Sequence, residues 1–298
     1  IVVSFTAGLW SSALTGRAAS GATPGRVFAE EAVEVEDANA SEASCQAALL
    51  TLLRMHGEGL ASCQPADLAT LRTVQLTEVS DADLVVLRRA SSGGRDLLPE
   101  LRDLSVRGGR FRGEGLEHLR GLRRLERLDL AGSGLESLDD FPPGLTALEE
   151  LDLSDTLVST EDLRGNVMRL PHLVSLDLSG TRVTGLGDVE KLGSLQRLDL
   201  GTTQVDDIGL AGLSALRRLE RLDLRYTLIS DATVDQLSSL ARLRWVDVTH
   251  TNVWWSSVAR LEQDRPEVEV RHDARTPPRP YWLTSEVTHR FGGGPEGR

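Results

Sequence analysis

The sequence predicts an α/β solenoid, in which short parallel strands form a curved sheet on the concave face and short helices or irregular segments return the chain on the convex face. Two observations predict this fold. A Leu-x-Leu pair recurs about every two dozen residues through the middle of the chain. Residues that favour helix N-termini precede apolar positions between these pairs. The chain is also long enough to bury a large core, with 298 residues that are 40% hydrophobic.

The charge balance excludes several classes of protein. Asp and Glu number 45 against 33 Lys and Arg, which gives a formal net charge of -12. A general binder of nucleic acid or of anionic membranes needs an excess of basic residues, so we expect neither partner. Two cysteines in a chain of this length also exclude a disulfide-dense miniprotein.

The N-terminal 43 residues divide into two segments. Residues 1–22 are apolar and end in small residues, like the later part of a secretory signal peptide, although they lack a basic start. Residues 23–43 are acidic and poor in large side chains, which predicts a disordered linker. We therefore expect a secreted, periplasmic or cell-surface protein without a membrane span, with a cytoplasmic location as the alternative.

A helical cap over the first coil is expected at residues 44–70. The leucines at 49, 50, 52 and 53 give one apolar face between Cys45 and Cys63. Since no other cysteine competes, a disulfide between these two is the preferred interpretation, and it would stabilise the fold by roughly 3 kcal/mol. Two buried free thiols in a cytosolic protein are the alternative. A metal site is disfavoured because no His or third Cys lies at ligand spacing.

The repeats occupy residues 71–272, about 8–9 coils. Each coil supplies one short strand whose alternate residues point inward. Leu71, Val74 and Leu76 form a degenerate first strand, and the longer step that follows predicts a bulging insertion near residues 90–95. The later strands are marked by the first residue of each pair: Leu104, Leu128, Leu151, Leu176, Leu198, Leu222, Val246 and Val268.

Each copy reads L-x-x-L-x-L-x-x-T-x-V, as in LVSLDLSGTRV at 173–183. This pattern resembles the leucine-rich repeat family over about two thirds of the chain, mixing the longer ITDxGL type found in cysteine-containing repeats with the shorter internalin-like unit. The family's usual Asn or Cys is replaced by a hydroxyl residue, which we expect to bond the turn backbone of the neighbouring coil. These residues are Ser133, Thr156, Thr181, Thr203, Thr227 and Thr251.

Helix starts and the C-terminal end complete the organisation. Thr160, Asp207 and Asp231 stand where a helix N-cap is expected. Residues 267–270 form the last expected strand, and the prolines at 277, 278 and 280 cannot continue the ladder. Residues 273–298 are a C-terminal cap and disordered tail, in which Tyr281 and Trp282 are candidates to cover the last coil.

An acidic column is predicted on the exposed face of the sheet. The residue between the two apolar positions of each pair points away from the core. In six consecutive coils it is an aspartate, and neighbouring aspartates at strand spacing repel by about 0.9 kcal/mol in water. The column is either a solvated, self-neutralising ladder or a contact surface for a basic partner segment. Its members are Asp129, Asp152, Asp177, Asp199, Asp223 and Asp247.

A second candidate site lies in the last coils, where we expect aromatic and basic side chains to converge on the concave face. Trp, Tyr and Arg dominate binding hot spots, so this cluster is a candidate protein-binding site. Trp254 and Trp255 on the neighbouring rim either plug the solenoid end, which is the preferred interpretation, or belong to the binding surface, for which Tyr226 and Trp245 are preferred. The predicted cluster consists of Arg221, Arg225, Tyr226, Trp245, Thr249 and His250.

No catalytic motif is present. The six histidines are scattered without metal spacing, and neither a nucleophile elbow nor a phosphate-binding loop occurs. We therefore expect no enzyme activity and no cofactor. The family resemblance implies a monomeric recognition module that binds a protein through its concave face. The alternatives are a scaffold or spacer with an inert concave face and, more weakly, a carbohydrate-binding surface.

Overall fold

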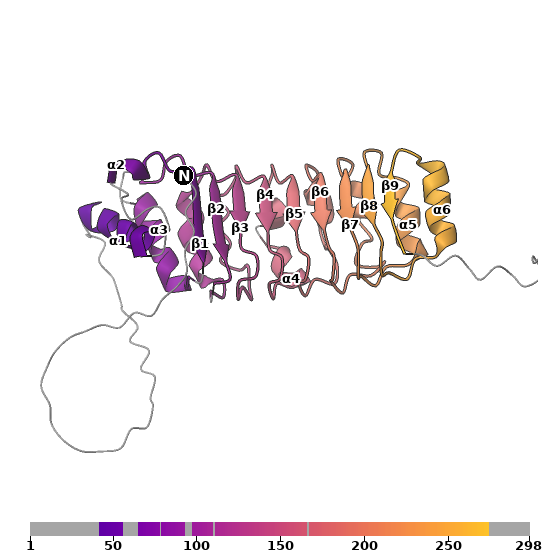
Figure 1. Cartoon of the computed structure of the whole chain (residues 1–298), viewed down its shortest axis with the longest axis horizontal. Coiled ribbons are helices and arrows are strands. Elements are labelled where there is room, and N and C mark those ends of the chain that lie inside the picture. Colours follow the sequence, from indigo (N-terminus) through magenta and orange to yellow (C-terminus); the bar gives the residue numbers. More distant parts are fainter. Residues whose placement is uncertain are drawn as a thin grey trace, which may run out of the picture.

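A computed structural model describes residues 42–55, 65–77, 79–92, 97–109, 111–165 and 167–273. One sheet of nine parallel strands follows the chain order and runs along the long axis of the molecule (Figure 1). This arrangement confirms the predicted solenoid. The strands are β1 (Thr73–Thr77), β2 (Asp103–Arg107), β3 (Arg127–Asp129), β4 (Glu150–Asp152), β5 (Ser175–Asp177), β6 (Arg197–Asp199), β7 (Arg221–Asp223), β8 (Trp245–Asp247) and β9 (Glu269–Arg271).

The strand register places the predicted leucines side by side. Leu128 pairs with Leu151, and Leu151 pairs with Leu176, and all three side chains are buried. The degenerate first strand also pairs as expected, with Val74 opposite Leu104. A continuous apolar core therefore runs from coil to coil, and no single coil could bury its leucines alone.

The last coil departs from the predicted register. Val246 pairs with Val270 rather than with Val268, so β9 is displaced by two residues from the expected strand. Val268 is buried before the strand, and its N–H bonds the Arg265 carbonyl as the Leu243 N–H bonds that of Leu240. The column of exposed residues consequently continues from Asp247 to Arg271, and the acidic run ends at β8.

Convex segments close the other side of the core. They are α3 (Asp81–Ser92), η1 (Glu114–Gly121), α4 (Thr160–Leu163), η2 (Val167–Arg169), η3 (Val189–Lys191), η4 (Leu213–Ala215), α5 (Asp231–Leu237) and α6 (Trp255–Asp264). The insertion expected to bulge near residues 90–95 is in part helical, because α3 extends to Ser92.

The helix N-caps lie one residue before two of the predicted ones. Ser159 caps α4 and Ser230 caps α5, because both serines have extended backbone while Thr160 and Asp231 are already helical. Asp207 has a different role, since its carboxylate accepts the N–H groups of Ser230 at 3.0 Å and of Thr233 at 3.1 Å in the next coil. It therefore joins two coils at the N-terminus of α5.

The hydroxyl column bonds within each coil. Every member donates to the carbonyl three residues earlier, over 2.5 to 2.7 Å, as Thr156 does to Leu153. The expected bond to the neighbouring coil is therefore wrong for this column. The short hydroxyl closes the turn after its own strand, and this explains how it replaces a longer Asn side chain.

The N-terminal end of the sheet carries α1 (Glu42–Met55) and α2 (Pro65–Leu68). Leu49, Leu50 and Leu53 of α1 are buried, and α1 packs against α3. Cys45 lies within α1, whereas Cys63 lies outside the described residues, so their disulfide stays a prediction. Residues 1–22, most of the linker at 23–43 and the tail from residue 274 are also outside the described part. Among the helices that are described, none has the length and apolar character needed to cross a membrane.

Candidate functional site

Each aspartate of the exposed column bonds its own strand end. Its Oδ1 accepts the N–H of the residue two positions later, from 2.8 Å for Asp199 and Gly201 to 3.1 Å for Asp129 and Ala131. The column therefore has a structural role in every coil, as a turn that follows each short strand. The second carboxylate oxygen is left for other contacts. Sequence reasoning missed this bond, although an aspartate repeatedly followed by turn residues was its signal.

The charge of the column is offset unevenly along the sheet. At β3 and β4, Arg107 Nε lies 2.5 Å from Asp129, and Arg107 Nη2 lies 3.7 Å from Asp152. Arg225 Nε lies 3.5 Å from Asp223, and Arg271 Nη1 lies 3.8 Å from Asp247. Arg127 and Arg197 instead pair with Glu150, at 3.2 Å and 2.8 Å, which lies beside the column. No salt bridge to Asp177 or Asp199 is present within the described part of the chain, so the least compensated acids of the column lie at β5 and β6, where Arg225 acts only at longer range.

Burial perturbs the central carboxylates. It raises the pKa of Asp199 to about 6, and the neighbouring carboxylates of Asp177 and Asp223 act in the same direction against the Gly201 N–H and Arg225. Burial also raises the pKa of Asp177 and of Asp223. Part of this acidic surface therefore holds its negative charge at a cost in free energy, which a bound cation would reduce.

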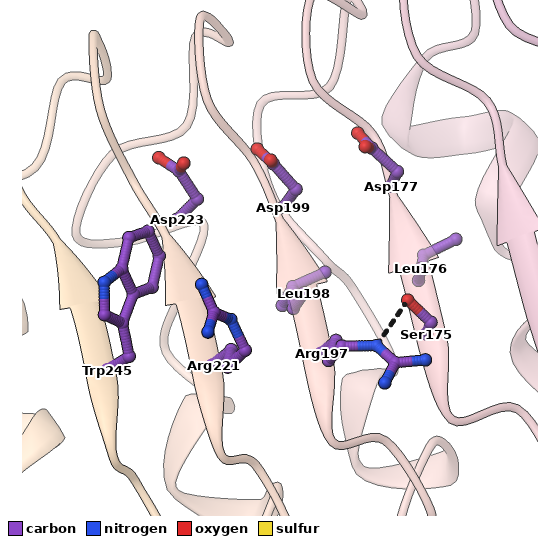
Figure 2. Close-up of a pocket in the computed structure, with 9 residues that line it drawn as sticks. All are labelled: Ser175, Leu176, Asp177, Arg197, Leu198, Asp199, Arg221, Asp223 and Trp245. Carbon is purple, nitrogen blue, oxygen red and sulfur yellow. Dashed lines mark hydrogen bonds between the residues drawn. The ribbon is translucent and has the colours of Figure 1, made fainter.

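A shallow depression of about 240 Å³ lies over β5 to β8. Figure 2 shows the carboxylates of Asp177, Asp199 and Asp223 in one row, with Arg197, Arg221 and Trp245 in a parallel row. The Arg221 guanidinium stacks over the Trp245 ring, 4.6 Å from its centroid. The depression thus combines an aromatic wall, two basic groups and three carboxylates, which are the chemical groups of a protein-binding hot spot.

The predicted cluster of the last coils divides into two parts. Arg221 and Trp245 begin β7 and β8, whereas Tyr226 and His250 lie three residues beyond the ends of these strands. The Tyr226 and His250 rings stack with centroids 4.2 Å apart, and both residues have left-handed backbone, with φ of 54° and 55°. Arg225 reaches back toward Asp223, at 3.5 Å. The Arg221–Trp245 pair and the Tyr226–His250 pair therefore lie at opposite ends of the strands and do not converge.

Burial bears on four other predicted positions. Asp223 and Asp247 are only 7% and 3% exposed, so the part of the acidic column open to a partner runs from Asp129 to Asp199, and within it Asp177 and Asp199 have no salt bridge among the described residues. Trp254 is 63% exposed and precedes α6, whose buried residues are Ser257, Val258 and Leu261. Trp255, the first residue of α6, is 37% exposed, so neither tryptophan is buried, and a plug formed by the two stays a prediction.

The described residues contain no group of three or more His, Cys, Asp or Glu side chains arranged to hold a metal ion. Chemically, the depression offers hydrogen bonds, charge and an aromatic surface. It can accordingly bind a charged or polar segment of another molecule.

Comparisons with known proteins show which proteins this chain resembles. No protein-family model matches the chain. The "Acidic leucine-rich nuclear phosphoprotein 32-related protein" of Plasmodium falciparum is 32% identical over 89 residues, which are 30% of this chain and 31% of that protein. The chain thus matches less than a third of that relative's length.

Similar solved structures include internalin C2 from Listeria monocytogenes, with 22% identity and a TM-score of 0.55 over 76% of this chain and 92% of that one. A second Listeria internalin matches with a TM-score of 0.48 and 16% identity over 69% of this chain and 62% of its own. A repeat protein from Leptospira interrogans has the same TM-score and 18% identity over 68% of this chain and 55% of its own. At this identity, the likeness to internalin C2 shows the fold alone.

Proposed function

We propose that this chain, which has the leucine-rich repeat fold, is a non-enzymatic recognition module that binds a protein partner through the concave face over β5 to β8. The observation that carries the proposal is the depression beside Trp245, which the Arg221–Trp245 pair shares with the carboxylates of Asp177 and Asp199, both without a salt bridge among the described residues. A basic segment of the partner would offset these charges. The fold neighbours support a binding role in general, and the chemistry of the depression selects the surface.

The distribution of charge on the concave face favours a recognition module over an inert spacer. Arg107 pairs with Asp129 and Asp152, and Arg225 and Arg271 lie within 4 Å of Asp223 and Asp247, so the fold offsets its acidic column where an arginine is in reach. At Asp177 and Asp199 no such salt bridge is present among the described residues, Arg225 acts only at longer range, and burial penalises both charges. Groups that weaken the folded state are commonly kept where function needs them. We include a location outside the cytoplasm in the proposal, in keeping with the signal-like residues 1–22.

Site-directed photo-crosslinking in the native source tests the surface. A photoreactive residue at position 197 should capture one protein, because Arg197 lines the depression. The same residue at position 260, on the exposed side of α6, is the matched control and should not capture that protein. Capture from position 260 alone would contradict the proposal and favour the spacer.

Salt dependence tests the role of the carboxylates. If Asp177 and Asp199 contact a basic segment, the affinity for the captured partner should fall as ionic strength rises, since partly exposed charges are screened. The double substitution Asp177→Asn and Asp199→Asn should flatten this dependence. An affinity that is unchanged between low and high salt would remove the acidic column from the contact surface.

A further inference from the structure

A second surface lies on the rim of the solenoid, beyond the ends of β7 and β8. In the turn after β7, Tyr226 and Leu228 are 56% and 57% exposed, while Thr227 and Ile229 between and after them are buried. In the turn after β8, His250, Asn252 and Trp254 alternate outward in the same way. We call the outward side chains of Tyr226, Leu228, His250, Asn252 and Trp254 the rim patch.

The two turns hold the rim patch together. The Tyr226 N–H donates to the Thr249 carbonyl at 3.0 Å, and the Asn252 N–H donates to the Ile229 carbonyl at 3.0 Å. The Trp254 N–H donates to Asp231 Oδ1 at 2.9 Å. Together with the Tyr226–His250 ring stack, these bonds make one continuous surface that is aromatic and apolar at the same time.

The other coils act as an internal control. At the position of Tyr226 and His250 they carry Gly108, Gly132, Asp155, Gly180 and Thr202, all with left-handed backbone. A bulky residue in this conformation is strained, because its Cβ approaches the backbone, whereas glycine is not. The two C-terminal coils thus carry two exposed rings where three earlier coils have glycine and two have the smaller polar residues Asp155 and Thr202. Repeat geometry does not require this, so the rings need another reason.

Asp273 contacts His250 of the rim patch. Its carboxylate accepts the His250 N–H at 2.8 Å and lies 3.0 Å from His250 Nδ1. The sequence then reads ARTPPRP at 274–280, with prolines at 277, 278 and 280. Four residues span at most about 13 Å, so the first proline is within reach of the Tyr226–His250 ring pair that Asp273 contacts. A tethered segment also has a high effective concentration at such a surface.

The chemistry of the segment fits the patch. Proline-rich segments dock on surfaces lined by Trp and Tyr, because their extended conformation is preformed and loses little entropy. A segment without N–H groups at these positions cannot instead extend the sheet beyond β9. Arg275 and Arg279 add positive charge next to a rim that carries Asp231 and Asp273. We propose that residues 276–280 of this chain dock on the rim patch, with proline rings against Tyr226 and Trp254.

Hydroxyl-radical footprinting of the full chain tests this without any partner, so its outcome is independent of the proposed concave-face function. The test variant is P277S/P278S/P280S, and P295S is the matched control. Oxidation of Trp254 and Tyr226 should rise at least about two-fold in the triple variant, since a docked ring covers roughly one face of an aromatic side chain. Leu157, exposed at the equivalent rim position of an earlier coil, should not change. P295S should match the original chain.

Three results would overturn the proposal. Equal oxidation of Trp254 in the original chain and the triple variant would show that the prolines do not cover it. Protection that is lost on tenfold dilution would assign the patch to the segment of a second copy. An unprotected original chain that becomes protected on adding an ARTPPRP peptide would assign it to an external proline-rich partner. Equal thermal unfolding midpoints of the three proteins confirm that folding is unchanged.

Discussion

Asp199→Asn should stabilise the protein at neutral pH. The asparagine keeps an oxygen to accept the Gly201 N–H, which lies 2.8 Å from Asp199 Oδ1, but removes the charge. Burial raises the pKa of Asp199 from 3.8 to about 6. A shift of this size corresponds to at most about 3 kcal/mol, and solvent screening of a half-buried group reduces this to roughly 1 kcal/mol.

The sign follows from proton uptake. A carboxylate with a raised pKa in the folded state weakens folding at high pH, and this penalty disappears as pH falls through about 6 and is gone near 3.8. Asp199→Asn should therefore exceed the original chain in unfolding free energy by about 1 kcal/mol at pH 7.5, with little difference near pH 4.

Urea unfolding at the two pH values measures this difference. The control is Asp129→Asn, which loses the 2.5 Å contact with Arg107 and should be neutral or destabilising at pH 7.5. If Asp199→Asn destabilises the protein as Asp129→Asn does, or stabilises it equally at both pH values, the reasoning about an uncompensated charge is refuted.

Three further predictions concern two contacts between coils and the cysteines of the N-terminal cap. Asp207→Ala should cost about 3 kcal/mol in urea unfolding, because the Ser230 and Thr233 donors lose a charged acceptor. Burial alone would raise the pKa of Asp207, but these hydrogen bonds hold it below 3.8. The stability that Asp207 contributes is therefore fully present above pH 3.8 and is lost only as the pH falls through the lower pKa of the folded state. A loss below about 1 kcal/mol for Asp207→Ala would contradict the bridging role. Gly209→Ala should destabilise by about 2 kcal/mol or more, since the new Cβ would stand 2.1 Å from the Thr184 carbonyl oxygen, whereas Gly193→Ala, with open space, should change little. Mass spectrometry of the unreduced protein should show the loss of two hydrogens for a Cys45–Cys63 disulfide, and an unchanged mass would establish free thiols.

Periodicity predicted the core because each strand must point its apolar residues inward, and neighbouring coils must then align. The same rule could not fix the register of the last coil, because Val268 and Val270 are two residues apart and both can face the core. Helix starts were displaced for a similar reason, since Ser230 and Asp231 are both good caps and only the backbone decides between them.

The candidate site was predictable only in part. The exposed aspartates follow from strand alternation, but their bonds to the next turn depend on backbone conformation after the strand. The separation of Tyr226 from Trp245 depends on the same turn, where the chain leaves the sheet in a left-handed conformation. Residue type alone did not indicate that turn, because glycine occupies it in some coils and larger residues in others.

The most direct test of the central claim is the affinity of the captured partner for Trp245→Ala, with Trp254→Ala as the matched aromatic control outside the depression. The account predicts that Trp245→Ala weakens binding by about tenfold or more, as a hot-spot truncation does, without lowering the unfolding midpoint by more than a few degrees. Trp254→Ala should bind as the original chain does. Unchanged affinity of Trp245→Ala would show that the concave face over β5 to β8 is not the recognition surface.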